Sequence, residues 1–223
     1  MPASVDWGLR EYTDALAEMR RMRAQRRRGE IPDTLILVEH PPVITVGVQG
    51  GDGEMLPPGI AVVSVERGGK STYHGPGQLV AYPIVDLDRR GRDVRRFVHE
   101  TEELVVRTLA TVGLTAGRVT GRRGVWVDGE RKIASVGIAV EEWVTFHGLA
   151  LNVTNDLAPF AAFHPCGFDG RVMTSVEREL ARPISVAALK PPLVRAFGEL
   201  FAPGAPPIGP IAAPPMPVSG AAG

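Results

Sequence analysis

The chain has 223 residues, of which 44% are hydrophobic, and this length suits one soluble domain with a sizeable core. Its 25 Lys and Arg balance its 25 Asp and Glu, which disfavours a dedicated nucleic-acid binder because such proteins usually carry a basic excess. The single cysteine argues against an internal disulfide, and the lack of a CxxC or HExxH motif argues against a metal site. The sequence has no apolar run of about 18 residues that could span a membrane and no signal-peptide pattern. These features favour the cytoplasm.

Apolar residues at helical spacing predict a first helix over residues 8–28, whose buried face comprises Leu9, Tyr12, Leu16 and Met19. Six arginines lie between positions 20 and 28, and two interpretations stay open: a solvated helix end, or a docking surface for an acidic protein partner. The runs "TLILVEH", "VITVG", "AVVSVE" and "QLVAYPIVDL" predict strands. Pro83 places the last of them near a sheet edge or a bulge.

A second helix is predicted from an Asp93 cap to Val112, and Gly113 ends it. The segment "GVWVDGERKIASVGIAV" predicts a hairpin that turns at Asp128-Gly129, a strong two-residue turn signal. A further strand, "WVTFHGLALNV", follows the hairpin.

The last predicted helix, "SVAALKPPLVRAFGELF", is interrupted near Pro191. Strands and helices are mixed without regular βαβ alternation, which predicts an α+β fold with a mixed, largely antiparallel sheet. We expect one catalytic or binding domain over residues 1–201. Residues 202–223 are rich in Pro, Ala and Gly and carry no charge, so we expect them to be disordered or draped over the surface.

The segment "ERGGKSTYHGPGQLVAYP" is the densest motif. It is not a phosphate-binding P-loop, because Ser64 stands where that motif needs its first glycine and "YHGPG" cannot open a helix. Glycines in this segment let a ligand approach the backbone closely. A plain loop and a binding segment are both open interpretations.

Lys132 begins a strand after the hairpin turn, and a period of two places it on the face of Ala134. Both faces of this strand are apolar, so the direction of the side chain stays open, and an ordinary surface lysine is the plain alternative. His147 precedes a glycine in the next strand, where a satisfied core histidine is the simpler interpretation.

Cys166 follows a proline and precedes a glycine in "AFHPCGFDGR". A lone cysteine of this kind is often a small apolar filler. His164 stands two positions earlier and is a candidate base for it, although a rigid proline separates them. The neighbours alone therefore leave filler and nucleophile open.

Three blocks together resemble one known family. "RGGKSTYHGPGQLVAYPI", "RKIASVGIAVEEWVTFHGLALNV" and "FHPCGFDGRVMTSVERE" match, in order and spacing, the signature blocks of the lipoyl(octanoyl) transferases, and "EHPPVITVG" is also similar to this family. The resemblance spans roughly residues 9–200. It implies a fold like the catalytic domain of biotin and lipoate ligases. The stretch "VGVQGGDG" and the proline-rich tail depart from the pattern.

The resemblance also implies an activity and its residues. The donor would be octanoyl-acyl carrier protein, and the acceptors would be lipoyl domains of 2-oxoacid dehydrogenases and the glycine cleavage H protein. Cys166 matches the family's nucleophile and Lys132 its active-site lysine. A thioester donor is already activated, so no ATP, metal or other cofactor is expected. The acyl-binding segments match Arg67, Gly68, Gly69, Lys70, Ser71, Thr72, Tyr73, His74, Ser135, Val136, Gly137, Gly148, Leu149 and Ala150.

Three other functions remain possible from the sequence. An ATP-dependent lipoate or biotin ligase would share the fold without needing a cysteine. A cysteine hydrolase would use Cys166 with His164 or His147. An acyl-chain binding module would hold the chain without any covalent step.

Overall fold

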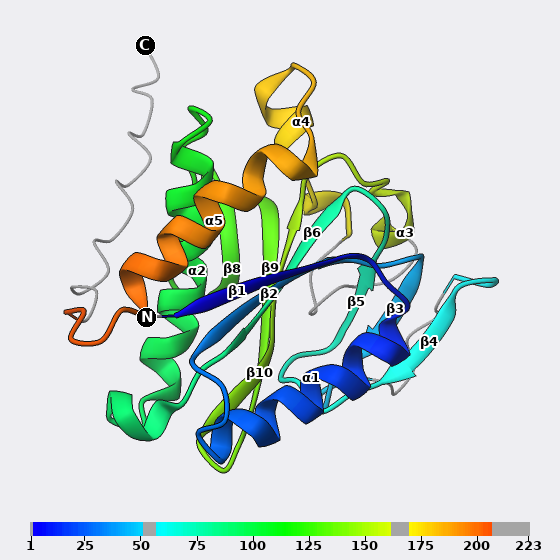
Figure 1. Cartoon of the computed structure of the whole chain (residues 1–223). Coiled ribbons are helices and arrows are strands. Elements are labelled where there is room, and N and C mark those ends of the chain that lie inside the picture. Colours follow the sequence, from blue (N-terminus) through cyan, green and yellow to red (C-terminus); the bar gives the residue numbers. More distant parts are fainter. Residues whose placement is uncertain (1, 51–56, 162–169, 207–223) are drawn as a thin grey trace.

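The computed structural model describes residues 2–50, 57–161 and 170–206. Their strands are β1 (Ala3–Leu9), β2 (Thr34–Glu39), β3 (Val43–Val46), β4 (Ala61–Ser64), β5 (Ser71–His74), β6 (Gln78–Ile84), β7 (Gly117–Val119), β8 (Arg122–Val127), β9 (Arg131–Glu141) and β10 (Val144–Asn152). The larger sheet has seven strands in the order β1-β2-β6-β10-β9-β8-β7, and a smaller sheet has the order β4-β3-β5 (Figure 1). β1 pairs with β2 in parallel, whereas the other neighbours in the larger sheet are antiparallel. This is the predicted α+β fold with a largely antiparallel sheet.

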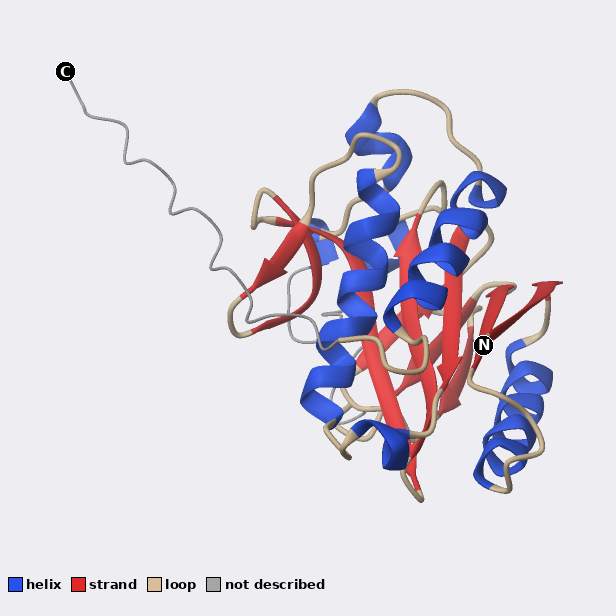
Figure 2. Cartoon of the chain, turned by 60° about the vertical axis from the view of Figure 1, so that its left-hand side comes forward, coloured by secondary structure: helices blue, strands red, loops and turns tan. Residues whose placement is uncertain are grey.

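Helices cover both faces of the larger sheet. The α-helices are α1 (Tyr12–Arg27), α2 (Val94–Ala110), α3 (Ala158–Ala161), α4 (Val176–Leu180) and α5 (Val186–Leu200), and the 3-10 turns are η1 (Leu87–Arg90) and η3 (Gly170–Val172). α2 and α5 lie side by side on one face, and α1 packs on β6 and β10 from the other (Figure 2). No helix of the described residues is both long and apolar enough to cross a bilayer.

The continuous apolar run of β2 reflects burial on both faces. Leu35 and Leu37 belong to the core under α2 and α5, whereas Ile36 and Val38 belong to the core under α1. A strand buried on both sides needs no polar alternation, which is why this one appears in the sequence as an unbroken apolar run.

Two local signals act as the sequence predicts. The carboxylate of Asp93 accepts the backbone N–H of Arg96 at 2.9 Å and caps α2. Asp128 and Gly129 have φ values of 50° and 73° between β8 and β9, as a two-residue turn with positive φ at both centres requires.

The predicted first helix begins too early. Residues Ala3–Leu9 form β1 at the sheet edge, and the helix starts only at Tyr12. Leu9 is 64% exposed instead of facing the core. Parallel pairing of β1 with β2 gives these backbone groups partners that helical spacing in the sequence does not reveal.

The edge position inferred from Pro83 is wrong, because β6 lies between β2 and β10. The site is a gap in the ladder rather than a bulge, because the bridge of Asp86 with Val144 keeps the register of Ala81 with Leu149. The ladder with β10 stops at Ala81, and His147 on β10 has a φ of 57°. Gly148 makes room here, since a Cβ at that position would lie 2.6 Å from the Cδ of Pro83 and collide with the Ala81 carbonyl. A central strand therefore tolerates the proline where the partner strand lacks a side chain.

The predicted interruption of the last helix is also wrong, because α5 runs unbroken through Pro191 and Pro192. Its apolar face, which includes Leu189, Leu193 and Phe197, is buried in the core with α2. We attribute the continuity to this packing, which offsets the hydrogen bonds lost at the prolines. The boundary between the domain and the tail stays a prediction, since residues 207–223 lie outside the described residues.

Candidate active site

A β-bulge sets the direction of Lys132. Val125 pairs with Ala134 but Trp126 pairs with Lys132, so Ile133 is an extra residue on β9. Directly paired residues share a face and successive residues of β8 alternate, so Lys132 and Ala134 lie on opposite faces. Ala134 belongs to the core under α2 and α5. The period of two, which places Lys132 on the face of Ala134, is therefore wrong.

Lys132 is buried, with 2% of its surface exposed. Its Nζ lies 5.6 Å from the centroid of the Trp126 ring, within range of a cation–π contact. Its carbonyl accepts the backbone N–H of Thr174 at 2.9 Å, and Lys132 and Met173 form a parallel bridge. Met173, seven residues after Cys166 in the sequence, is thus attached to the strand at Lys132.

A narrow pocket opens on the α1 side of the sheet. Its cavity has a volume of about 30 Å³, small beside the roughly 300–1,000 Å³ usual for small-molecule sites. Strands β9 and β10 form one wall, and mostly polar residues from four other segments form the rest. The lining residues are Tyr12, Arg67, Thr72, His74, Val80, Tyr82, Ser135, Val136, Gly137, His147, Gly148, Leu149 and Ala150.

The pocket brings together most of the residues expected to bind the acyl chain. From the three matched segments, the lining includes Arg67, Thr72, His74, Ser135, Val136, Gly137, Gly148, Leu149 and Ala150. The other expected residues, Gly68, Gly69, Lys70, Ser71 and Tyr73, do not line it. Segments distant in the sequence therefore converge on one apolar slot.

Arg67 holds the glycine-rich loop in place. Its guanidinium donates to the Thr45 carbonyl at 2.7 Å and to the Lys70 carbonyl at 2.8 Å. The backbone N–H of Gly68 donates to the Ile138 carbonyl of β9 at 2.9 Å. The loop is thus fastened both to the small sheet and to the strand that forms the pocket wall.

Gly137 permits this close approach. A Cβ on Gly137 would lie 3.0 Å from both the Cδ of Arg67 and the carbonyl oxygen of Gly68. A side chain at this position would require Arg67 and the loop to move by a few tenths of an ångström. The glycine of "SVG" therefore has a packing reason that the sequence alone does not show.

Tyrosines and histidines cluster at the pocket. The His40 Nδ1 donates to the Arg10 carbonyl at 2.8 Å, and its Nε2 accepts from the Tyr82 hydroxyl at 2.8 Å. The His74 Nδ1 donates to the Gln78 Oε1 at 2.7 Å. His40 therefore has both ring nitrogens satisfied in its neutral form, and His74 needs no second proton for its bond.

Burial keeps these imidazoles uncharged. It lowers the pKa of His40 to about 4 and the pKa of His74 to about 3. Burial likewise lowers the pKa of His147 to about 4, against the opposing attraction of the Glu66 carboxylate. The imidazoles at the pocket are thus neutral at physiological pH, and Arg67 brings a positive charge to its lining.

A buried carboxylate supports the strand next to Lys132. Glu102 of α2 is 4% exposed, and its Oε1 accepts the backbone N–H of Gly124 at 2.8 Å. Gly124 has a φ of 104°, and a Cβ there would lie 2.8 Å from the Cε of Lys132. Gly124 therefore lies between the carboxylate and the lysine and leaves room for the lysine stem.

Cys166 and His164 lie outside the described residues. The residues on either side of that segment meet, because Gly170 packs directly on the backbone of Phe160 and Ala161. Phe160 in turn contacts Tyr73 edge-to-face at 5.6 Å. Within the described ranges, no group of three or more His, Cys, Asp or Glu is arranged to hold a metal ion.

Comparison with known proteins decides the family. The model of the lipoyl protein ligase A/B catalytic domain matches residues 11–198. The chain belongs to this family. The octanoyltransferase of Geobacter sulfurreducens is 45% identical over 196 residues, covering 88% of this chain and 83% of that protein. The octanoyltransferase of Geobacter metallireducens is 48% identical over 185 residues, covering 83% and 86%.

Solved structures of lipoate and biotin ligases share the fold of this lipoyl protein ligase A/B domain. A bi-partite lipoate protein ligase of Thermoplasma acidophilum superposes with a TM-score of 0.68 at 19% identity, covering 89% of this chain and 82% of that one. The biotin protein ligase of Aquifex aeolicus, in complex with biotin and ATP, gives a TM-score of 0.52 at 10% identity, covering 88% and 69%.

Sequence reasoning missed several residues of this lipoyl protein ligase A/B site. Tyr12 and Tyr82 line the pocket from α1 and β6; Tyr12 stands outside the three matched blocks, and Tyr82 stands in the first block but outside its acyl-binding segment. His147 also lines the pocket, although its burial agrees with the simpler core interpretation. Only the packing of α1 on β6 and β10 brings these side chains together.

Proposed function

We propose that this enzyme transfers an octanoyl group from octanoyl-acyl carrier protein to a lysine of lipoyl-accepting domains, through a thioester on Cys166, in lipoate biosynthesis. The similar octanoyltransferases support the octanoyl transfer. One structural observation carries the rest: a slot walled by β9 and β10 lies on the same face of the sheet as a buried lysine.

The lining of the slot suits the chemistry of an octanoyl chain. Val80 and Ala150 supply apolar surface on the α1 side of the sheet, and the glycines of β9 and β10 remove side chains that would fill the slot. Each methylene buried there contributes about 0.8 kcal/mol of binding. The buried imidazoles are neutral, so no fixed positive charge from them opposes an apolar chain.

Lys132 is the proposed partner of Cys166. An ordinary cysteine thiol, with a pKa of about 8.5, is only a few per cent thiolate at neutral pH, and a neighbouring ammonium favours the thiolate. The thiol proton passes to Lys132, and the thiolate attacks the donor carbonyl. The bond from that carbon to the carrier sulfur breaks, and the leaving carrier thiolate takes the proton from Lys132.

Lys132 is then neutral and serves as the base of the second half-reaction. The acceptor amine attacks the Cys166 thioester and gives its proton to Lys132. The amide bond forms, the carbon–sulfur bond breaks, and the thiolate–ammonium pair is restored. Because the donor thioester is already activated, this cycle consumes no ATP and requires no metal.

A reconstituted transfer reaction tests the proposal. Purified enzyme, octanoyl-acyl carrier protein and a lipoyl domain should yield an octanoylated lipoyl domain without ATP, and Cys166→Ala should abolish the product. Release of pyrophosphate as a condition of transfer would instead indicate a ligase. Free octanoate formed without any acceptor would indicate a hydrolase.

A further inference from the structure

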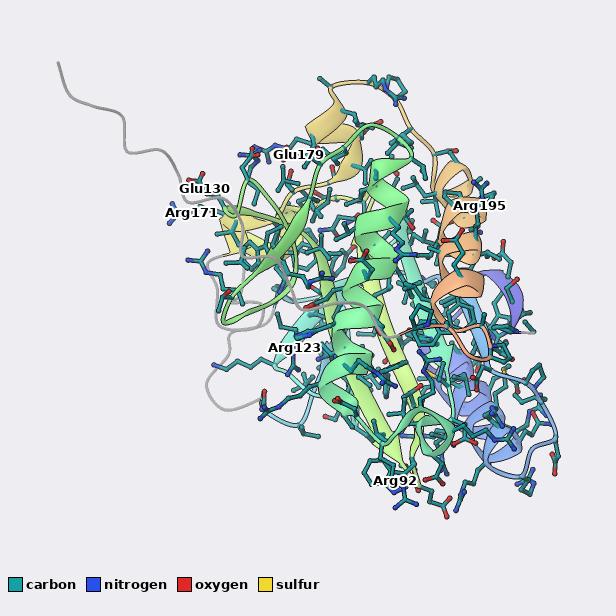
Figure 3. All side chains as sticks on the ribbon, turned by 90° about the vertical axis from the view of Figure 1, so that its left-hand side faces the viewer. Arg92, Arg123, Glu130, Arg171, Glu179 and Arg195 are labelled. Carbon is teal, nitrogen blue, oxygen red and sulfur yellow. The ribbon has the colours of Figure 1, made fainter. Side chains whose placement is uncertain are left out.

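An arginine-lined groove lies on the α2 side of the molecule, beside the proposed active site. It runs between the first half of α2 and the β7–β8 hairpin. We name it the arginine groove and define it by Arg95, Arg118, Arg122 and Arg123, with Glu102 at its floor. Figure 3 looks onto this face and labels Arg123 beside α2.

The cations of this groove are only partly neutralised. Arg118 pairs with Glu103 at 2.9 Å. Arg95, Arg122 and Arg123 are exposed, and none of them has a carboxylate within ion-pair distance among the described residues. Arg122 stacks over the Trp126 ring at 5.4 Å, which orients its guanidinium without neutralising it.

The arginines of α1 and its C-cap, Arg28, differ in this respect. Each of the six is within 4.0 Å of at least one carboxylate. The pairs are Arg20–Glu66, Arg21–Glu18, Arg23 with Glu141 and Glu142, Arg26 with Asp33 and Asp86, Arg27–Asp88, and Arg28–Glu30. The positive run that stands out in the sequence is therefore largely cancelled in the fold. It gives an acidic partner less to bind than the arginine groove does.

The groove also adjoins the reaction centre. A terminal nitrogen of Arg123, Nη1, lies 3.3 Å from the place that a Cβ on Gly68 would take, so it reaches the glycine-rich loop. The next residue, Gly124, packs on the stem of Lys132. A molecule docked on Arg123 would therefore contact a residue that reaches the glycine-rich loop and directly precedes the glycine beside Lys132.

We propose that the arginine groove docks the acidic carrier that delivers the acyl thioester. This inference rests on the proposed function and assigns a surface to its donor. Guanidinium groups bind carboxylates and phosphates through paired hydrogen bonds, so they suit both an acidic carrier and the phosphodiester of its thioester arm. The acceptor brings a lysine ammonium to the same centre, and Arg123 would repel that charge. The groove therefore favours the donor over the acceptor.

The test compares two triple variants with the same loss of charge. Arg95→Gln, Arg122→Gln and Arg123→Gln remove the groove cations, and Arg20→Gln, Arg21→Gln and Arg28→Gln form the matched control on α1. Steady-state assays measure KM for octanoyl-acyl carrier protein, for a small octanoyl thioester and for the lipoyl domain. Intact-mass measurement reports acylation of the enzyme.

We expect the groove variant to raise KM for the carrier-bound donor about tenfold at low ionic strength and to weaken its salt dependence. The control variant should change this KM less than twofold, and both variants should use the small thioester as wild type does. An unchanged KM for the carrier-bound donor, an equal loss with the small thioester, or a rise confined to the lipoyl domain would each overturn the groove assignment. Wild-type enzyme that the carrier-bound donor cannot acylate at all would refute the proposed function itself.

Discussion

Acidification should destabilise this protein through its buried histidines. His40 has no exposed surface, and His74 is 6% exposed. Burial lowers the pKa of His40 to about 4 and the pKa of His74 to about 3, from an ordinary value of about 6.5. Both groups are neutral in the folded protein at pH 5, whereas the unfolded chain binds their protons.

The size of the effect follows from these values. Stability is intact above about pH 6.5 and falls as the pH drops below that value, because protons bind preferentially to the unfolded state. At pH 5 each histidine lowers the free energy of unfolding by about 2 kcal/mol, and the two together by about 4 kcal/mol. That is a large part of the 5–15 kcal/mol typical of a folded domain.

Urea unfolding followed by tryptophan fluorescence at pH 7.5 and pH 5.0 measures the difference. His40→Gln should lose about 2 kcal/mol less than wild type between the two pH values. Burial raises the pKa of Glu100 and of Glu102, which acts in the opposite sense, but this contribution is common to both proteins and cancels. His99→Gln is the matched control and should change the difference less, because His99 is only partly buried. Equal losses in wild type and His40→Gln would refute the reasoning.

Three further predictions concern the site. Gly124→Ala should cost about 1–3 kcal/mol of stability, measured by urea unfolding, and should slow acylation, because φ is 104° and the new Cβ would displace Lys132. Ala150→Val should shift the preferred acyl chain from eight carbons towards six in competition assays, since two lost methylenes are worth about 1.6 kcal/mol. Lys132→Arg should retain more acylation than transfer in single-turnover assays, because a guanidinium keeps its charge but cannot act as a base; equal losses would argue against the dual role.

Local signals in the sequence account for much of the fold. The Asp93 cap, the Asp128-Gly129 turn and the apolar run of β2 each act through neighbouring residues, so they can be recognised without a structure. The glycine-rich loop and the two pocket strands were likewise recognisable, because three motifs occur together in a fixed order.

The remaining features depend on long-range pairing. β1 is a strand because it meets β2, and the bulge at Ile133 depends on the register of β8 with β9. That bulge decides on which face Lys132 lies, so no period read from the strand alone could place it. The neutralised arginines of α1 show the same limit, since partners such as Glu66 and Glu141 stand far away in the sequence.

The central claim is that Cys166 carries the octanoyl group during transfer. Intact-mass analysis after mixing the enzyme with octanoyl-acyl carrier protein, without acceptor, tests this most directly. We expect one octanoyl group per chain, removed by hydroxylamine as a thioester would be and absent from Cys166→Ala. An adduct that persists in Cys166→Ala, or a wild-type enzyme that transfers octanoate yet never carries it, would contradict the account.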